Sequence, residues 1–120
     1  LAYTASSSYV RYKSNIFINA GIEIENFEKA LNIIKKQIED LKNGDFTDEQ
    51  IENEKKGIVS QINTIDDEQD TEIIYFFGQE LIGVNVPIEK YKENVNKVTR
   101  EQIQNVASKV EINTIYFLRN

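Results

Sequence analysis

The pattern of apolar and polar positions over the first 23 residues predicts two β-strands joined by a turn. Residues 1–12 are rich in β-branched and aromatic residues around a run of three serines at 6–8, which predicts a long, mostly polar strand. Residues 16–23 place isoleucine or alanine at every second position, the pattern of a strand with one buried face. With a turn near 13–15, we expect the two strands to pair as an antiparallel hairpin.

Beyond residue 25 the apolar spacing becomes that of helices. The first stripe covers 27–41 and ends at Asn43-Gly44, where a glycine in the left-handed region would stop the helix. Four more stripes follow, and they predict helices over 51–65, 70–83, 87–95 and 100–110. The chain therefore carries five predicted helices after the hairpin.

Local signals mark where these helices begin. Thr47 with Gln50 forms one capping box and Thr99 with Gln102 forms a second, so each pair can satisfy two exposed backbone amides. Asp70 is placed to cap the third helix. Pro87 suits the first turn of the fourth helix, because its missing N–H would lack a helical partner there anyway.

The last segment, 112–118, is apolar on both faces, as expected of a central strand. The element order is then strand, strand, five helices, strand, which defines an α+β fold with an antiparallel sheet of about three strands covered by helices. A sheet of three strands offers too little surface for five helices to pack on. We therefore expect residues 1–120 to be a single partial domain from which part of the sheet is absent.

Composition narrows the function classes. The 40% of hydrophobic and 28% of charged residues are those of an ordinary globular domain, and the 120 residues suffice for one core. A net charge of −6 opposes binding to nucleic acid. No apolar run is long enough for a membrane span, and no targeting segment is recognisable, so the cytoplasm is the expected location.

The residue types that are missing limit the chemistry further. The sequence contains no His, Cys, Met or Trp, which removes the commonest general base and the commonest zinc ligands. The one dense acidic group lacks the alternating spacing and central glycine of a calcium loop, so we interpret it as a loop and helix cap; it comprises Asp66, Asp67, Glu68 and Asp70. We therefore expect no catalytic residue and no metal ligand in this chain.

Aromatic and basic side chains gather near the amino end. Tyr3, Tyr9 and Tyr12 could present hydroxyls to a peptide, although tyrosines on a half-exposed strand more often serve packing. Arg11 and Lys13 form a small basic spot at the hairpin turn, where the expected role is solubility or protection of a strand edge.

Several short sequence motifs, taken in their order along the chain, resemble the latter part of a domain of the M16 zinc metallopeptidases, the pitrilysin and processing-peptidase family. The motifs are Leu1-Ala2-Tyr3 before the serine-rich strand, Phe17-Ile18-Asn19-Ala20-Gly21-Ile22, Asn43-Gly44-Asp45-Phe46-Thr47, and Val98-Thr99-Arg100-Glu101-Gln102-Ile103. They run along essentially the whole chain. The serine-rich opening and the ending 114–118 are most similar to bacterial homologues classed as inactive.

The resemblance implies a place within the M16-type α/β roll, the LuxS and processing-peptidase type of metallohydrolase fold. Members of the family hydrolyse peptides between two halves that enclose a chamber, with zinc held by a His-x-x-Glu-His motif and a distal Glu. None of these residues can lie here. In catalytic assemblies the opposite half supplies the Tyr that ends the Leu-Ala-Tyr motif, together with an upstream Arg, to orient substrate. Tyr3 matches that Tyr, whereas the Arg would precede Leu1.

The function implied by the resemblance is a non-catalytic M16 domain that helps to form a peptide-enclosing chamber. Its partner would be a zinc-bearing half of the same or another chain, and zinc would belong to that half. The parent would be a zinc-dependent endopeptidase or an inactive homologue. The residues leave a second hypothesis open, a free-standing interaction or scaffold module. We expect the isolated chain to self-associate through its incomplete sheet, which would favour the non-catalytic M16 domain over the free-standing module. An enzyme working through carboxylates alone has no supporting pair of positions.

Overall fold

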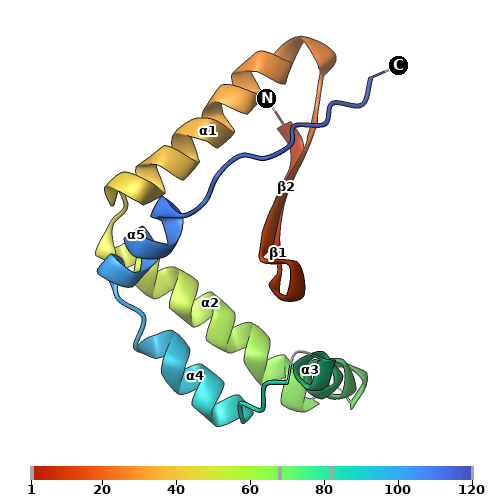
Figure 1. Cartoon of the computed structure of the whole chain (residues 1–120), viewed down its shortest axis with the longest axis vertical. Helices are drawn as coiled ribbons and strands as arrows, with labels where there is room; N and C mark the ends of the chain where they lie inside the picture. The colour runs from red at the N-terminus through yellow and green to blue at the C-terminus, as the bar shows by residue number, and fades with distance from the viewer. Residues whose placement is uncertain (1, 68, 82, 120) are drawn as a thin grey trace.

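A computed structural model describes residues 2–67, 69–81 and 83–119. A two-stranded hairpin is followed by five α-helices, so the α+β class and the helix count agree with the sequence (Figure 1). The elements in chain order are β1 (Ala2–Val10), η1 (Arg11–Lys13), β2 (Asn15–Ile22), η2 (Ile24–Asn26), α1 (Phe27–Asn43), α2 (Asp48–Asp67), α3 (Gln69–Leu81), α4 (Ile88–Asn96) and α5 (Arg100–Ser108).

The hairpin is antiparallel, as predicted, with Ser8 opposite Phe17. β1 ends at Val10, two residues before the predicted limit at Tyr12. The cause is the short 3-10 turn η1, which Ser14 closes in the left-handed conformation (φ 51°) by donating its N–H to the Arg11 carbonyl at 3.2 Å.

The predicted buried face of β2 is not buried. Ile16 and Ile18 are 49% and 44% exposed, and Phe17 on the opposite face is 48% exposed. The alternation is present in the sequence, but no layer of the described chain covers either face of the hairpin. The alternation of β2 therefore indicates a face that is suited to burial, but the described residues of the chain leave that face exposed.

Most predicted helix ends are confirmed. Gly44 follows α1 with φ 77°, and its N–H donates to the Asp40 and Leu41 carbonyls. Gln50 and Thr47 close the first capping box: the Gln50 N–H donates to Thr47 Oγ1 at 3.1 Å, and the Thr47 N–H donates to Gln50 Oε1 at 2.7 Å. The second box, of Thr99 and Gln102, has both bonds as well, at 3.2 Å and 2.9 Å.

Two helix starts differ from the prediction by one or two positions. Pro87 precedes the first residue of α4 with extended backbone (ψ 147°), and its carbonyl accepts from the Tyr91 N–H at 2.9 Å. It therefore serves as the N-cap residue. Asp70 is the second residue of α3, within its first turn, because the helix already begins at Gln69. There its carboxylate faces the positive end of the helix dipole rather than capping it.

The predicted third strand is wrong for the described residues. Segment 110–119 forms no regular element, and the sheet has two strands. The segment leaves α5 and runs from α1 toward the hairpin (Figure 1). Phe117 stacks on Phe27 at the start of α1, with ring centroids 4.2 Å apart. Phe117 thus packs on a helix, whereas Tyr116 and Leu118 beside it are 82% and 75% exposed. Among the described residues, no neighbouring strand supplies the hydrogen-bond ladder that a β-strand needs.

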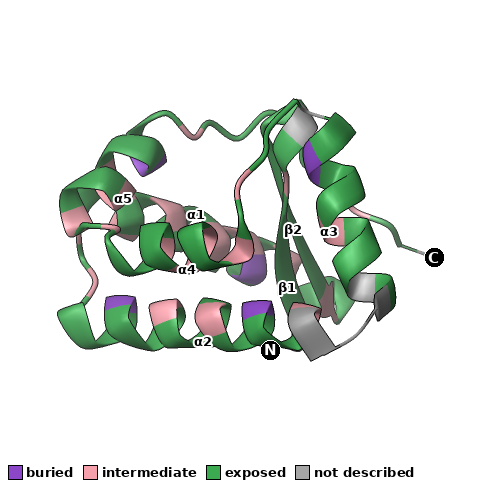
Figure 2. Cartoon of the chain, turned by 90° about the horizontal axis from the view of Figure 1, so that it is seen from below, coloured by how far each residue is buried: buried purple, intermediate pink, exposed green. Residues whose placement is uncertain are grey.

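The core is small and the remaining apolar surface is large. α1 packs mainly against α5, while α2 packs against α3 and α4. In the described part of the chain, four apolar residues are buried: Ala30, Ile51, Ile62 and Ala107 (Figure 2). One stripe of α3 stays uncovered, with exposed fractions of 59–70% at Ile73, Ile74, Phe77 and Leu81. Monomeric proteins seldom expose so much contiguous apolar surface.

Among the helices that the structure describes, none combines the length and the apolar character that a membrane crossing demands.

The pH dependence of α4 centres on Glu93. Hydrogen bonds from Lys90 and Lys97, together with their charges, lower the pKa of Glu93 from 4.5 to about 2. Because this pKa is depressed in the folded state, the stabilisation is present above the unfolded pKa and is lost as the pH falls through about 2. Both ion pairs of Glu93, with Lys90 and Lys97, are exposed to solvent, so we expect salt to weaken them.

A carbon-detected NMR titration of the Glu93 carboxyl checks this expectation. Its pKa should lie well below the usual value for a glutamate side chain and should rise in the Lys90→Gln variant. Titration of Glu93 at the same pH in both proteins would contradict the assignment of the shift to Lys90.

Candidate functional site

Tyr3, the one site residue predicted from the sequence, lies on β1 with 73% of its surface exposed. Its hydroxyl donates to Glu23 Oε1 at 2.6 Å. Glu23 directly follows β2, and the hairpin brings the two residues together because Ala2 pairs with Ile22. A shallow hollow of about 90 Å³ lies beside the pair, lined also by Ala2 and Asn26.

The hydrogen bond to Glu23 decides what the Tyr3 hydroxyl can do. The carboxylate accepts the phenolic proton, which raises the pKa of Tyr3, and slight desolvation adds to the effect. The hydroxyl therefore stays protonated at neutral pH. Its lone pairs remain open to a donor, whereas it can donate to a substrate carbonyl only after leaving Glu23.

The other tyrosines named from the sequence do not join this site. Tyr9 is 61% exposed and lies six residues further along β1, about 20 Å from Tyr3 at the rise of a strand. The side chain of Tyr12 is outside the described part of the structure. The candidate site therefore consists of the hydrogen-bonded side chains of Tyr3 and Glu23, at the end of the hairpin opposite its turn.

The acidic cluster gives no metal site within the described residues. Asp70 is exposed on α3, and the side chains of Asp66, Asp67 and Glu68 lie outside the description. Over the part of the chain that the structure describes, no three His, Cys, Asp or Glu side chains come together as a metal site would require. The residues present do not fit the zinc that the M16 resemblance implies for a catalytic half.

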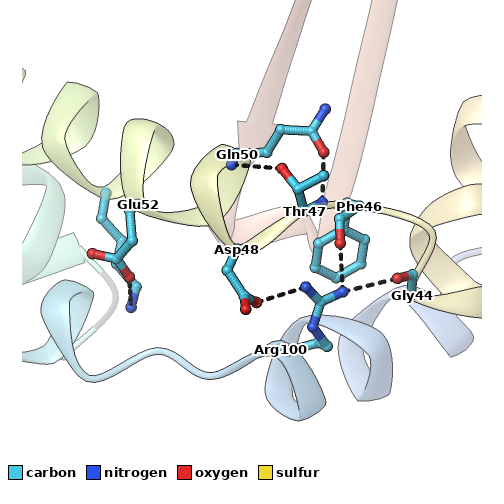
Figure 3. Close-up of polar contacts among 8 residues, drawn as sticks. Gly44, Phe46, Thr47, Asp48, Gln50, Glu52 and Arg100 are labelled. Carbon is cyan, nitrogen blue, oxygen red and sulfur yellow. Dashed lines mark hydrogen bonds and ion pairs between the residues drawn. The ribbon is translucent and has the colours of Figure 1, made fainter.

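Arg100 forms a set of polar contacts, here called the Arg100 joint, that was not predicted from the sequence (Figure 3). Its Nη1 donates to the carbonyls of Gly44 at 2.9 Å and Phe46 at 2.5 Å, and its Nη2 pairs with Asp48 Oδ1 at 2.7 Å. The guanidinium also lies over the Phe46 ring, 4.7 Å from its centroid. Arg100 thereby ties the start of α5 to the α1–α2 loop, more than fifty residues away in sequence.

A second unpredicted cluster fixes the connection between α3 and α4. Gln79 is 5% exposed, and its amide donates to the Val86 carbonyl at 3.0 Å while its Oε1 accepts from the Val86 N–H at 2.6 Å. The Tyr75 hydroxyl donates to the same carbonyl at 3.1 Å. Burial, followed by the nearby Tyr91, raises the pKa of Tyr75, so this donor stays protonated. No local signal marks Gln79, because a glutamine among apolar helix residues is usually exposed.

With this geometry in view, the similarities to known proteins are informative. Residues 1–58 match the family model described as the peptidase M16 inactive domain. Over 121 aligned residues, 99% of the chain, the sequence is 37% identical to the probable inactive metalloprotease YmfF of Bacillus subtilis (strain 168). The crystal structure of a conserved protein from Enterococcus faecalis V583 superposes on 90% of the chain with a TM-score of 0.80 and 27% identity.

These matches place residues 1–58 with the inactive-domain type of the M16 peptidases. The M16 resemblance predicted from the sequence is confirmed, since residues 1–58 match the family model and the alignment with the Bacillus relative runs over nearly the whole chain. The chain spans 28% of the length of the Bacillus relative and 26% of the Enterococcus chain.

Proposed function

We propose that this chain is a non-catalytic M16 domain that forms part of the wall of a peptide-enclosing chamber and pairs with a zinc-bearing half, in the same or a partner chain. The observation that carries the proposal is a match to an inactive M16 domain in a chain without a single histidine. Such a chain has no imidazole with which to hold zinc or to move a proton. Zinc and the water that it activates would belong to the other half.

The finer fold is part of the same proposal. The hairpin would belong to a larger M16-type α/β roll whose remaining strands lie outside these 120 residues. Three features support it: the uncovered isoleucines of β2, the free outer edges of a two-stranded sheet, and the extended segment 110–119 without a strand partner. Unpaired edges of this kind invite pairing with another chain segment.

Complex formation with a zinc-bearing M16 subunit tests the proposal. The chain, the subunit and their mixture would each be run on size exclusion with light scattering and assayed on a quenched fluorescent peptide. We expect a stoichiometric complex in the mixture and no hydrolysis by the chain alone. Zinc-dependent hydrolysis by the purified chain, or a mixture that never associates, would refute it.

Tyr3 is the proposed substrate contact of this wall. In the assembled protein, Tyr3→Phe should weaken the binding of an unlabelled peptide about 3- to 10-fold, since one hydrogen bond is lost. Glu23→Gln removes the carboxylate that holds the Tyr3 proton and should leave binding unchanged or tighter. Fluorescence anisotropy competition measures both.

A purely structural Tyr3 would give another outcome. Peptide affinity would then be the same for wild type and Tyr3→Phe, and the matched change Tyr9→Phe on the same strand would behave identically.

A further inference from the structure

A groove lies where the hairpin turn meets three helices. It has a volume of about 410 Å³ and is lined by residues of η1, α2, α3 and α4. Its apolar side is formed by Ile58, Ile62 and Ile65 of α2, of which Ile62 is only 5% exposed. The volume is at the small end of the range typical of ligand sites, enough for one or two amino-acid residues.

The polar side chains that line the groove are those of Arg11, Gln61, Tyr75, Gln79 and Tyr91. Gln79 and Tyr75 are committed to the Val86 backbone and hold the wall formed by α3 and the link to α4. Arg11, by contrast, makes no ion pair with any residue that the structure describes, and its guanidinium lies over the Tyr91 ring, 5.9 Å from the centroid. The groove is thus an apolar trough with one guanidinium at its edge.

The guanidinium of Arg11 differs in this respect from that of Arg100. Acidic residues outnumber basic ones 20 to 14, and Arg100 by comparison uses its donors on Asp48 and two carbonyls. A guanidinium presents five N–H donors in a planar fork that matches a carboxylate, and it has no acceptor. The complementary ligand therefore carries a carboxylate next to an apolar body.

We propose that this groove binds the carboxyl-terminal residue of a peptide, with the free α-carboxylate on Arg11 and an apolar side chain against the isoleucines of α2. The inference stands apart from the chamber proposal, because every wall of the groove belongs to this chain. A small free carboxylic acid shares the chemistry but fills less of the volume. The peptide end is favoured because it offers both the anion and a second residue for the remainder of the trough.

Isothermal titration calorimetry with a pentapeptide ending in Ala-Leu tests the proposal on the full chain. We expect binding with 1:1 stoichiometry and about tenfold or greater loss when the terminal carboxylate is replaced by an amide. 3-Phenylpropionate serves as the small-acid probe and should bind more weakly than the peptide. Equal binding of acid and amide peptides, no binding of the acid peptide, or tighter binding of 3-phenylpropionate would each overturn the assignment.

Two matched pairs of variants locate the site. Arg11→Gln should lose about tenfold in affinity, whereas Lys13→Gln on the same turn should not, because Lys13 does not line the groove. Gly78 lines the groove, and apart from its chain neighbours and the backbone of α3 no atom lies within 4 Å of where its Cβ would stand. Gly78→Leu should therefore fill the trough and abolish binding without a clash in α3. Gly57→Leu, equally open but outside the groove, should bind normally. Unchanged affinity in both Arg11→Gln and Gly78→Leu would exclude this groove as the site.

Discussion

Replacing Gln79 with alanine is expected to lower the free energy of unfolding by about 2–3 kcal/mol. The change removes both bonds to Val86 and leaves its N–H without the partner that now lies at 2.6 Å. The Val86 carbonyl keeps the Tyr75 hydroxyl as a donor, so the cost comes mainly from one orphaned amide and the lost packing of a side chain that is 5% exposed. Urea unfolding followed by circular dichroism measures the difference.

A charged replacement sharpens this test. Gln79→Glu keeps the shape and the acceptor for the Val86 N–H but places a second oxygen against the Val86 carbonyl. Burial raises the pKa of such a carboxyl, so its protonated form is favoured in the folded state and the variant should regain stability as the pH falls. Gln37→Ala on the exposed face of α1 is the control and should cost little. Equal costs for Gln79→Ala and Gln37→Ala would contradict the role assigned to Gln79.

Arg100→Ala is expected to cost about 2–3 kcal/mol of unfolding free energy, because one charged side chain serves two backbone carbonyls at once. The carbonyls of Gly44 and Phe46 lie in a loop that has no other described donor to replace it. Arg100→Lys should recover only part of the loss, since an ammonium cannot reproduce the fork of a guanidinium. The same urea unfolding measures both variants.

Asp48→Ala separates the ion pair from the carbonyl contacts. The Asp48 side chain is 89% exposed, so its bond to Arg100 should contribute less than about 1 kcal/mol. We therefore expect Asp48→Ala to be several-fold milder than Arg100→Ala. A loss in Asp48→Ala equal to that in Arg100→Ala would show that the Arg100 joint depends on the ion pair instead.

The features predicted correctly are those that neighbouring residues determine. Helix stripes, the stop at Gly44 and both capping boxes depend on contacts within about four residues, and each is present. The hairpin follows from two adjacent strand patterns and a turn. Small shifts at Pro87 and Asp70 reflect how weakly sequence fixes the first residue of a helix.

The features that were missed are non-local. Whether 112–118 is a strand depends on a neighbouring strand, and the burial of Ile16 and Ile18 depends on a covering layer, neither of which the sequence of those segments contains. Arg100 and Gln79 reach partners in distant loops, so no spacing rule marks them. Tyr3 was identified through the Leu-Ala-Tyr motif, yet its bond to Glu23 follows only from the hairpin register.

The hairpin and α3 point to the same physical conclusion. β2 exposes Ile16, Phe17 and Ile18, and α3 exposes a stripe from Ile73 to Leu81, while the buried core of the described residues is small. Burying apolar surface is the main favourable term in folding and association, so these surfaces favour a covering partner. In the proposed function that partner is the rest of an M16 assembly.

Sedimentation equilibrium of the isolated chain, across a wide range of concentrations, tests this central claim most directly. The account predicts an average mass that rises above the monomer with concentration, and mutation of Ile16 and Ile18 to threonine should suppress the rise. A chain that stays folded and monomeric at the highest concentration would contradict the claim and favour a free-standing interaction module.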